Sequence, residues 1–103
     1  MIKSFTVVNN IEPANFIKKV VDALSGRELG KIANMSLAEN EIMLSFSKLG
    51  KSEIIYSVTK VENGFTCNQK SEKIALIHRP MRKEMEEKFA KVLEDVGAKI
   101  DLA

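Results

Sequence analysis

The middle of the chain, from Gly30 to about Gln69, places apolar residues at every second position, and it lies between two segments with helical spacing. Twofold alternation is typical of a strand with one buried face, whereas spacings of three and four are typical of a helix with one buried face. A chain in this order has to bury the faces of several strands and two helices together. The pattern therefore limits the fold to a mixture of α and β structure.

Three alternating runs fill the middle segment, and turn residues separate them. The apolar positions of these runs are Ala33, Met35 and Leu37, then Ile42, Leu44 and Phe46, then Ile54, Tyr56 and Val58. Asn63-Gly64 predicts a tight hairpin turn because both residues tolerate positive φ, and a further strand with Phe65 and Cys67 follows it. Short connections make neighbouring strands antiparallel, so we expect a meander.

Helix and strand signals also flank this meander on both sides. Ile2 to Val8 is rich in β-branched residues and predicts a first strand. A helix is expected from Pro13, which suits a first helical turn, to Gly26, which suits the end of a helix. Its apolar face comprises Phe16, Ile17, Val20, Val21 and Leu24.

A second helix is expected from Pro80 to Val96, with Gly97 placed to end it. Its apolar stripe comprises Met81, Met85, Phe89, Val92, Leu93 and Val96. Ile100 and Leu102 alternate with polar residues and predict a short terminal edge strand.

The stretch from Lys73 to His78 is compatible with two structures. Its apolar run, Ile74 to Ile77, fits either a last buried strand or the opening of a long helix that starts near Ser71. Pro80 disfavours the helical conformation for the residue before it, so we expect a strand followed by a new helix. A helix kinked at the proline is the alternative.

These elements predict an α+β fold of two layers, in which two helices cover one face of a mostly antiparallel meander of four to six strands. At 103 residues, the chain has the size of one domain, so we expect residues 1–103 to form a single unit. No apolar run approaches the ~20 residues needed to cross a bilayer, and no secretion signal precedes the first strand. We therefore expect a cytoplasmic protein without membrane insertion.

Catalytic signatures for nucleophiles, metals and nucleotides are absent from the sequence. The single cysteine and the single histidine, Cys67 and His78, are the one pair that could act as nucleophile and base, and no third residue is placed to orient the imidazole. A half-buried, inert thiol fits the strand pattern around Cys67 better. We expect no enzyme activity, no metal and no cofactor.

Three cations and a histidine stand at the predicted start of the second helix: His78, Arg79, Arg82 and Lys83. A helix N-terminus favours acidic residues, so cations there run against the helix dipole. Cations beside free backbone N–H groups suit an anion, so we expect these residues to receive a phosphate, a carboxylate or an acidic partner surface. The alternative is a solvent-exposed face held by ion pairs four residues apart. Those pairs would be Arg82–Glu86, Lys83–Glu87, Glu84–Lys88, Glu87–Lys91 and Lys91–Asp95.

The favoured hypothesis is a small interaction module that binds a protein partner or a second copy of itself, as in a homodimer. A carrier of a small apolar or amphipathic ligand, held between the sheet and the second helix, is one alternative. Weak nucleic-acid binding through the basic segment and Lys48, Lys51 and Lys60 is another. A net charge of +2 is small for a dedicated nucleic-acid binder, which makes nucleic acid the poorer alternative.

Overall fold

Six strands form one sheet in the order β2-β3-β4-β5-β1-β6, and every neighbouring pair runs antiparallel. A computed structural model describes residues 2–101 of the protein. Its elements are β1 (Ser4–Val7), α1 (Pro13–Ser25), the 3-10 helix η1 (Glu28–Lys31), β2 (Ala33–Ala38), β3 (Glu41–Ser47), β4 (Lys51–Val61), β5 (Gly64–Lys73), the 3-10 helix η2 (Leu76–Met81), α2 (Arg82–Asp95) and β6 (Ala98–Asp101).

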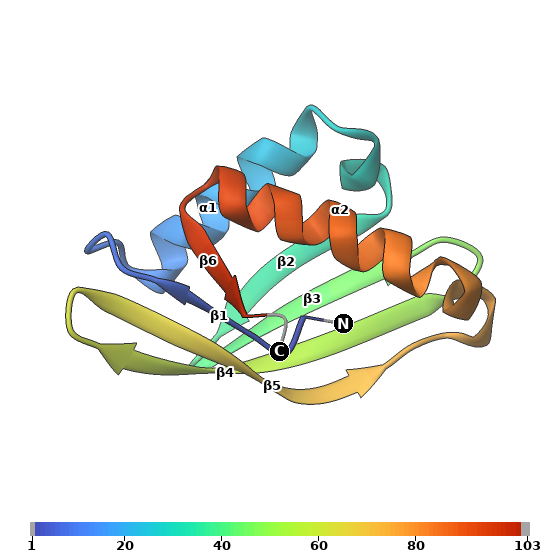
Figure 1. The fold of residues 1–103 in the computed structure, drawn as a ribbon. Coiled ribbons are helices and arrows are strands. Elements are labelled where there is room, and N and C mark those ends of the chain that lie inside the picture. Colours follow the sequence, from blue (N-terminus) through green and yellow to red (C-terminus); the bar gives the residue numbers. More distant parts are fainter. Residues whose placement is uncertain (1, 102–103) are drawn as a thin grey trace.

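Both helices lie on the same face of the sheet, so the predicted two-layer α+β fold is confirmed (Figure 1). α1 connects β1 to the edge strand β2, and α2 connects β5 to the other edge strand, β6. The core lies between the two layers and contains all six aromatic residues, each at most 1% exposed. Phe46 of β3 meets Phe89 of α2 edge to face, with ring centroids 6.0 Å apart. This contact packs α2 against β3, the strand next to the edge strand β2.

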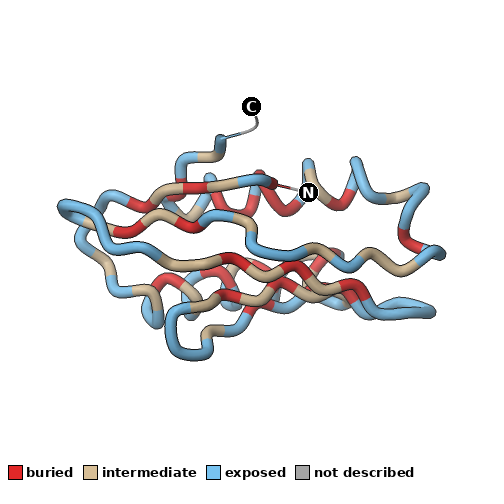
Figure 2. Tube along the Cα trace, turned by 90° about the horizontal axis from the view of Figure 1, so that it is seen from below, coloured by how far each residue is buried: buried red, intermediate tan, exposed pale blue. Residues whose placement is uncertain are grey.

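The face of the sheet away from the helices is polar. Residues that alternate with the core positions point to this side, and many of them carry hydroxyl or amide groups: Ser4, Thr6, Asn34, Ser36, Ser45, Ser57, Thr59, Thr66 and Asn68. Figure 2 shows buried residues alternating with partly exposed ones along the central strands. A bulge between Ile55 and Tyr56 sets Lys70 outside the ladder, where it pairs with Glu41 of β3. Such bulges increase the local twist of a sheet.

The turns of the meander contain the residues with positive φ that tight connections require. Asn63 has φ 65° between β4 and β5, as Asn63-Gly64 predicted, and Glu39 and Leu49 have φ 57° in the two turns before it. The predicted terminal strand is present as β6, which contains Ile100, whereas Leu102 lies outside the described residues.

The prediction of a buried strand between Lys73 and His78 is wrong. β5 ends at Lys73, and residues from Leu76 onward form the 3-10 helix η2, so that α2 begins at Arg82. A 3-10 helix has three residues per turn, and every third residue from Ala75, including His78 and Met81, is at least half-buried. Leu76 and Ile77 fall between these positions and are 75% and 50% exposed.

Candidate functional site

The two buried polar side chains among residues 2–101, those of Ser52 and His78, contact each other at one end of the sheet. The Ser52 Oγ lies 2.5 Å from the His78 Nδ1, and the His78 Nε2 lies 2.7 Å from the Lys48 carbonyl oxygen. The Ala75 N–H donates to the Ser52 Oγ over 2.9 Å. We call this network the polar clamp, because it joins the β3–β4 turn, the start of β4 and the entry to η2.

The partners in the polar clamp fix the histidine tautomer. A carbonyl oxygen only accepts hydrogen bonds, so the His78 Nε2 carries the ring proton and donates it to Lys48. The His78 Nδ1 is then free to accept the Ser52 hydroxyl hydrogen, while the Ser52 Oγ accepts from Ala75. Every polar group of the network is satisfied by a neutral imidazole. Buried polar networks that are fully satisfied make their surroundings rigid.

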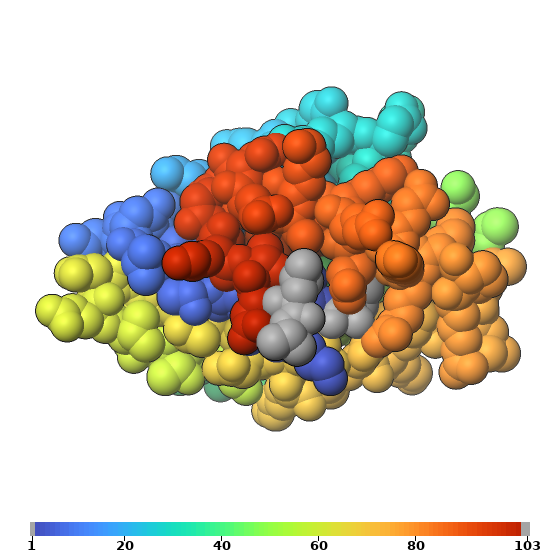
Figure 3. Space-filling view, viewed as in Figure 1, coloured from blue at the N-terminus to red at the C-terminus, as the bar shows by residue number. Residues whose placement is uncertain are grey.

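Three large aliphatic side chains project from the loops that the polar clamp joins. Leu49 of the β3–β4 turn is 87% exposed, and Leu76 and Ile77 of η2 are 75% and 50% exposed. The turn packs on η2, since a Cβ at Gly50 would lie 3.1 Å from the Ile77 Cγ2. We call Leu49, Leu76 and Ile77 the apolar cluster. Figure 3 shows the turn (green) beside η2 (orange) at one end of the molecule.

The segments that carry the apolar cluster are rich in cations. The two segments that form this end, residues 47–53 and 72–83, carry six cations and two carboxylates. Arg82 donates to Glu72 through two nitrogens, at 2.7 and 3.0 Å, and Lys51 lies 3.6 Å from Glu53. No ion pair within the described residues involves the other four cations: Lys48, Lys73, Arg79 and Lys83. We call residues 47–53 and 72–83 the basic end, which has a net charge of +4 against +2 for the whole chain.

The pKa of Glu72 is governed by its cationic neighbours. Partial burial acts to raise the pKa of Glu72, but the hydrogen bonds and charges of these neighbours, Arg82 first among them, hold it below the ordinary value. Glu72 therefore stays ionised and keeps Arg82 in place on the side of the basic end.

The predicted anion-binding residues separate into two groups. His78 is 1% exposed and uses both ring nitrogens inside the protein, so it does not reach the surface on which we expected it. Arg79, Arg82 and Lys83 are exposed at the basic end, where they flank the junction of η2 and α2. Anion binding by these three residues stays a prediction.

The alternative interpretation, a face of ion pairs four residues apart, is realised at one position. The Lys88 Nζ lies 2.9 Å from the Glu84 carboxylate, and this hydrogen bond lowers the pKa of Glu84. Two expected partners pair elsewhere: Arg82 with Glu72, and Asp95 with Arg27 at 2.7 Å. Arg82, the first residue of α2, is therefore tied to β5 of the sheet rather than to Glu86 in its own next turn.

Cys67 and His78 do not form a nucleophile and base pair. Cys67 is fully buried on β5, and burial raises the pKa of its thiol to about 12. The imidazole of His78 is hydrogen-bonded to Ser52 and Lys48 instead. Within residues 2–101, no group of three or more His, Cys, Asp and Glu side chains could hold a metal ion.

The sequence pattern did not reveal the polar clamp or the apolar cluster. Ser52 continues the alternation of Ile54 and Tyr56 along β4, and this place in the pattern was the available signal for its burial. Leu49 stands between two lysines and a glycine in a predicted turn, where an aliphatic residue has little chance of burial. Both features depend on η2, whose 3-10 period was not foreseen.

Comparisons of the chain with protein-family models, with curated proteins and with solved structures find no match. No helix within residues 2–101 is long and apolar enough to cross a membrane.

Proposed function

We propose that the protein is a non-catalytic interaction module that docks by its basic end on an acidic surface of a protein partner. The observation that carries this proposal is the apolar cluster, which projects into solvent from two loops that a buried hydrogen-bond network holds together. Single exposed leucines need no explanation, but three large aliphatic side chains exposed at one end of a molecule suit an interface. Rigid presentation lowers the entropy cost of binding.

The positive charge of the basic end indicates that the partner surface carries carboxylates. Lys48, Lys73, Arg79 and Lys83 have no ion-pair partner among the described residues, so carboxylates at their positions on a partner would be favourable. The matching surface is an apolar pocket or stripe with acidic residues at its rim. Cytoplasm remains the compartment that we propose for this interaction.

Two other functions fit the same surface less well. Proteins that bind single-stranded nucleic acid stack bases on aromatic side chains, and all six aromatic residues here are buried. Catalysis would need a reactive group within reach of solvent, and the thiol of Cys67 and the imidazole of His78 are both enclosed.

Backbone amide NMR with a synthetic helical peptide, Glu on one face and Leu on the other, tests the proposal. At low salt we expect the peptide to shift signals of residues 47–53 and 72–83 and few others. A twin peptide with Lys in place of each Glu is the control and should leave the signals of residues 47–53 and 72–83 unshifted. Absence of binding, or shifts spread over the open face of the sheet, would refute the proposal.

A carrier of a small amphipathic ligand is a second candidate, because a groove of about 550 Å³ lies between α2 and η1. Leu29, Ile32, Met81 and Met85 supply its apolar lining, and Glu28, Lys31, Lys48, Glu84 and Lys88 supply its charged lining. Methionines are common at surfaces that adapt to different ligands. Native mass spectrometry of the untreated protein should then detect a retained small molecule, and a spectrum with the bare chain alone counts against the carrier.

A further inference from the structure

The end of the molecule opposite the basic end has complementary features. β4 runs from Lys51 at the basic end to Val61 at the other, and eleven residues of strand span roughly 33 Å. The longest dimension of the molecule is 39 Å, so the two ends lie far apart along it. Figure 3 shows the far end as the yellow β4–β5 hairpin beside the blue loop that follows β1.

Carboxylates predominate at this far end, which we call the acidic end and define as residues 8–14, 37–41 and 58–65. No ion pair within the described residues involves Glu12, Glu39 or Glu62. Glu41 pairs with Lys70 on the open face of the sheet. Lys60 is the one cation of these segments, so the acidic end has a net charge of −2 even without Glu41.

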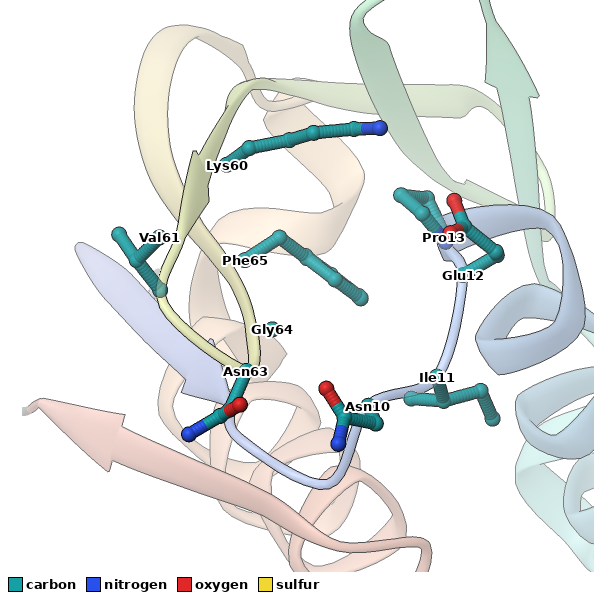
Figure 4. A pocket seen from close by; sticks show the side chains of 9 residues that line it. All are labelled: Asn10, Ile11, Glu12, Pro13, Lys60, Val61, Asn63, Gly64 and Phe65. Carbon is teal, nitrogen blue, oxygen red and sulfur yellow. The ribbon is translucent and has the colours of Figure 1, made fainter.

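Two shallow pockets lie side by side at the acidic end and share Glu12, Pro13 and Lys60. The first is lined by Asn10, Ile11, Glu12, Pro13, Lys60, Val61, Asn63, Gly64 and Phe65 (Figure 4). The second adds Ala14, Leu37, Glu39, Asn40 and Val58 to the shared residues. Their volumes are about 200 and 240 Å³, and a cavity of about 150 Å³ already holds a benzene molecule. Each pocket therefore has room for one leucine side chain.

We propose that the basic end of one copy docks on the acidic end of the next, so that the protein associates with itself head to tail. The projecting side chains of Leu49 and Leu76 would enter the two pockets. Ile11 and Val61 offer apolar contact in the first pocket, and Leu37 and Val58 offer it in the second. Lys48 and Arg79 would then lie near Glu12 and Glu39, and these attractions outnumber the repulsion from Lys60. This inference rests on the proposed function, and it names a second copy as the partner.

The geometry of this interface determines the assembly. The two contacting surfaces differ, so a dimer still has one free basic end and one free acidic end, and growth continues unless a ring closes. A small interface between loops gives weak association. Charges exposed to solvent are screened by salt, so association should weaken as ionic strength rises.

Sedimentation velocity over a concentration series gives the first test. At low salt, we expect the average sedimentation coefficient of the native protein to rise with concentration. In high salt, it should return to the value of the monomer. A monomer at every concentration at low salt would overturn the inference.

Mixing two variants identifies the interface. Leu49→Ser with Arg79→Gln disables the basic end, and Glu12→Gln with Glu39→Gln disables the acidic end. We expect each variant alone to stay monomeric. An equimolar mixture should form a dimer with one copy of each and nothing larger, since each variant retains one intact end. The control, Lys18→Gln with Val21→Ser on the exposed side of α1, should associate as the native protein does.

The outcomes distinguish this inference from the proposed function. If the Glu/Leu peptide binds the basic end but the mixture forms no dimer, the inference fails and the proposed function stands. If neither the peptide nor the second copy binds, both fail. Undiminished association of the basic-end variant alone would overturn the head-to-tail arrangement, because another surface would then be responsible.

Discussion

At the scale of single residues, the polar clamp determines what the basic end presents to a partner. His78 is buried, and its two ring nitrogens form hydrogen bonds with groups from the β3–β4 turn and the start of β4. Its burial directs Leu76 and Ile77 outward, because neighbours in a 3-10 helix point to different sides.

Removal of the Ser52 hydroxyl should destabilise the fold. Ser52→Ala leaves the Ala75 N–H and the His78 Nδ1 buried without partners, which costs about 1–3 kcal/mol. The matched control is Ser57→Ala on the open face of the same strand, where we expect a change within about 0.5 kcal/mol. Urea unfolding of both variants measures the difference. Equal free energies of unfolding would show that the polar clamp does not stabilise the protein.

Cys67 should make stability depend on alkaline pH. Burial raises the pKa of Cys67 to about 12 in the folded protein, whereas a cysteine of the unfolded chain titrates near 8.5. The unfolded state therefore loses its proton first, and stability falls as pH rises from about 9 towards 12. The contribution reaches about 1.4 kcal/mol for each pH unit. Cys67→Ala should reduce this slope between about pH 9 and 10 in urea unfolding; an unchanged slope would contradict the account.

At the scale of elements, close packing between the β4–β5 hairpin and β1 holds the acidic end together. A Cβ at Gly64 would lie 1.7 Å from the Val7 carbonyl oxygen, and the Asn10 N–H donates to the Asn63 carbonyl over 2.9 Å. The hairpin and the loop after β1 therefore form one unit around the first pocket.

Gly64→Ala should force β5 and β1 apart at this point. Overpacking costs roughly 1–3 kcal/mol, and the clash here is with backbone atoms, which cannot rotate away. Gly26→Ala is the control, because a Cβ at Gly26 meets nothing within 4 Å. We expect a lower midpoint of thermal unfolding for Gly64→Ala and none of that loss for Gly26→Ala. Equal midpoints would contradict the packing.

The elements also show which parts of the structure sequence patterns can predict. Strands β2 to β5 and both helices repeat their apolar residues with one clear period, so their buried faces could be assigned. The segment after Lys73 has four consecutive apolar residues and no resolved period, and a buried histidine decides its conformation. The exposed Arg79, Arg82 and Lys83 were placed correctly at the start of the helix region. The apolar cluster beside them was missed because it arises from contact between two distant loops.

At the scale of the whole molecule, charge is distributed unevenly along the longest axis. The basic end has a net charge of +4, so the remainder of the chain has −2. This separation of charge favours approach to an acidic partner in one orientation. The electrostatic attraction that orients the approach is stronger at low salt. After this approach, the apolar cluster would make the apolar contact with the partner. The cluster projects from loops that the sheet and α2 hold in place.

The affinity of the Glu/Leu peptide for a variant without the apolar cluster tests the central claim most directly. Leu49→Ser, Leu76→Ser and Ile77→Ser change side chains that are 87%, 75% and 50% exposed, so the variant should fold as the native protein does. We predict a dissociation constant raised roughly tenfold or more, the equivalent of about 1.4 kcal/mol, whereas Val21→Ser leaves it unchanged. An unaltered dissociation constant for the triple variant would contradict the assignment of this cluster as the docking surface.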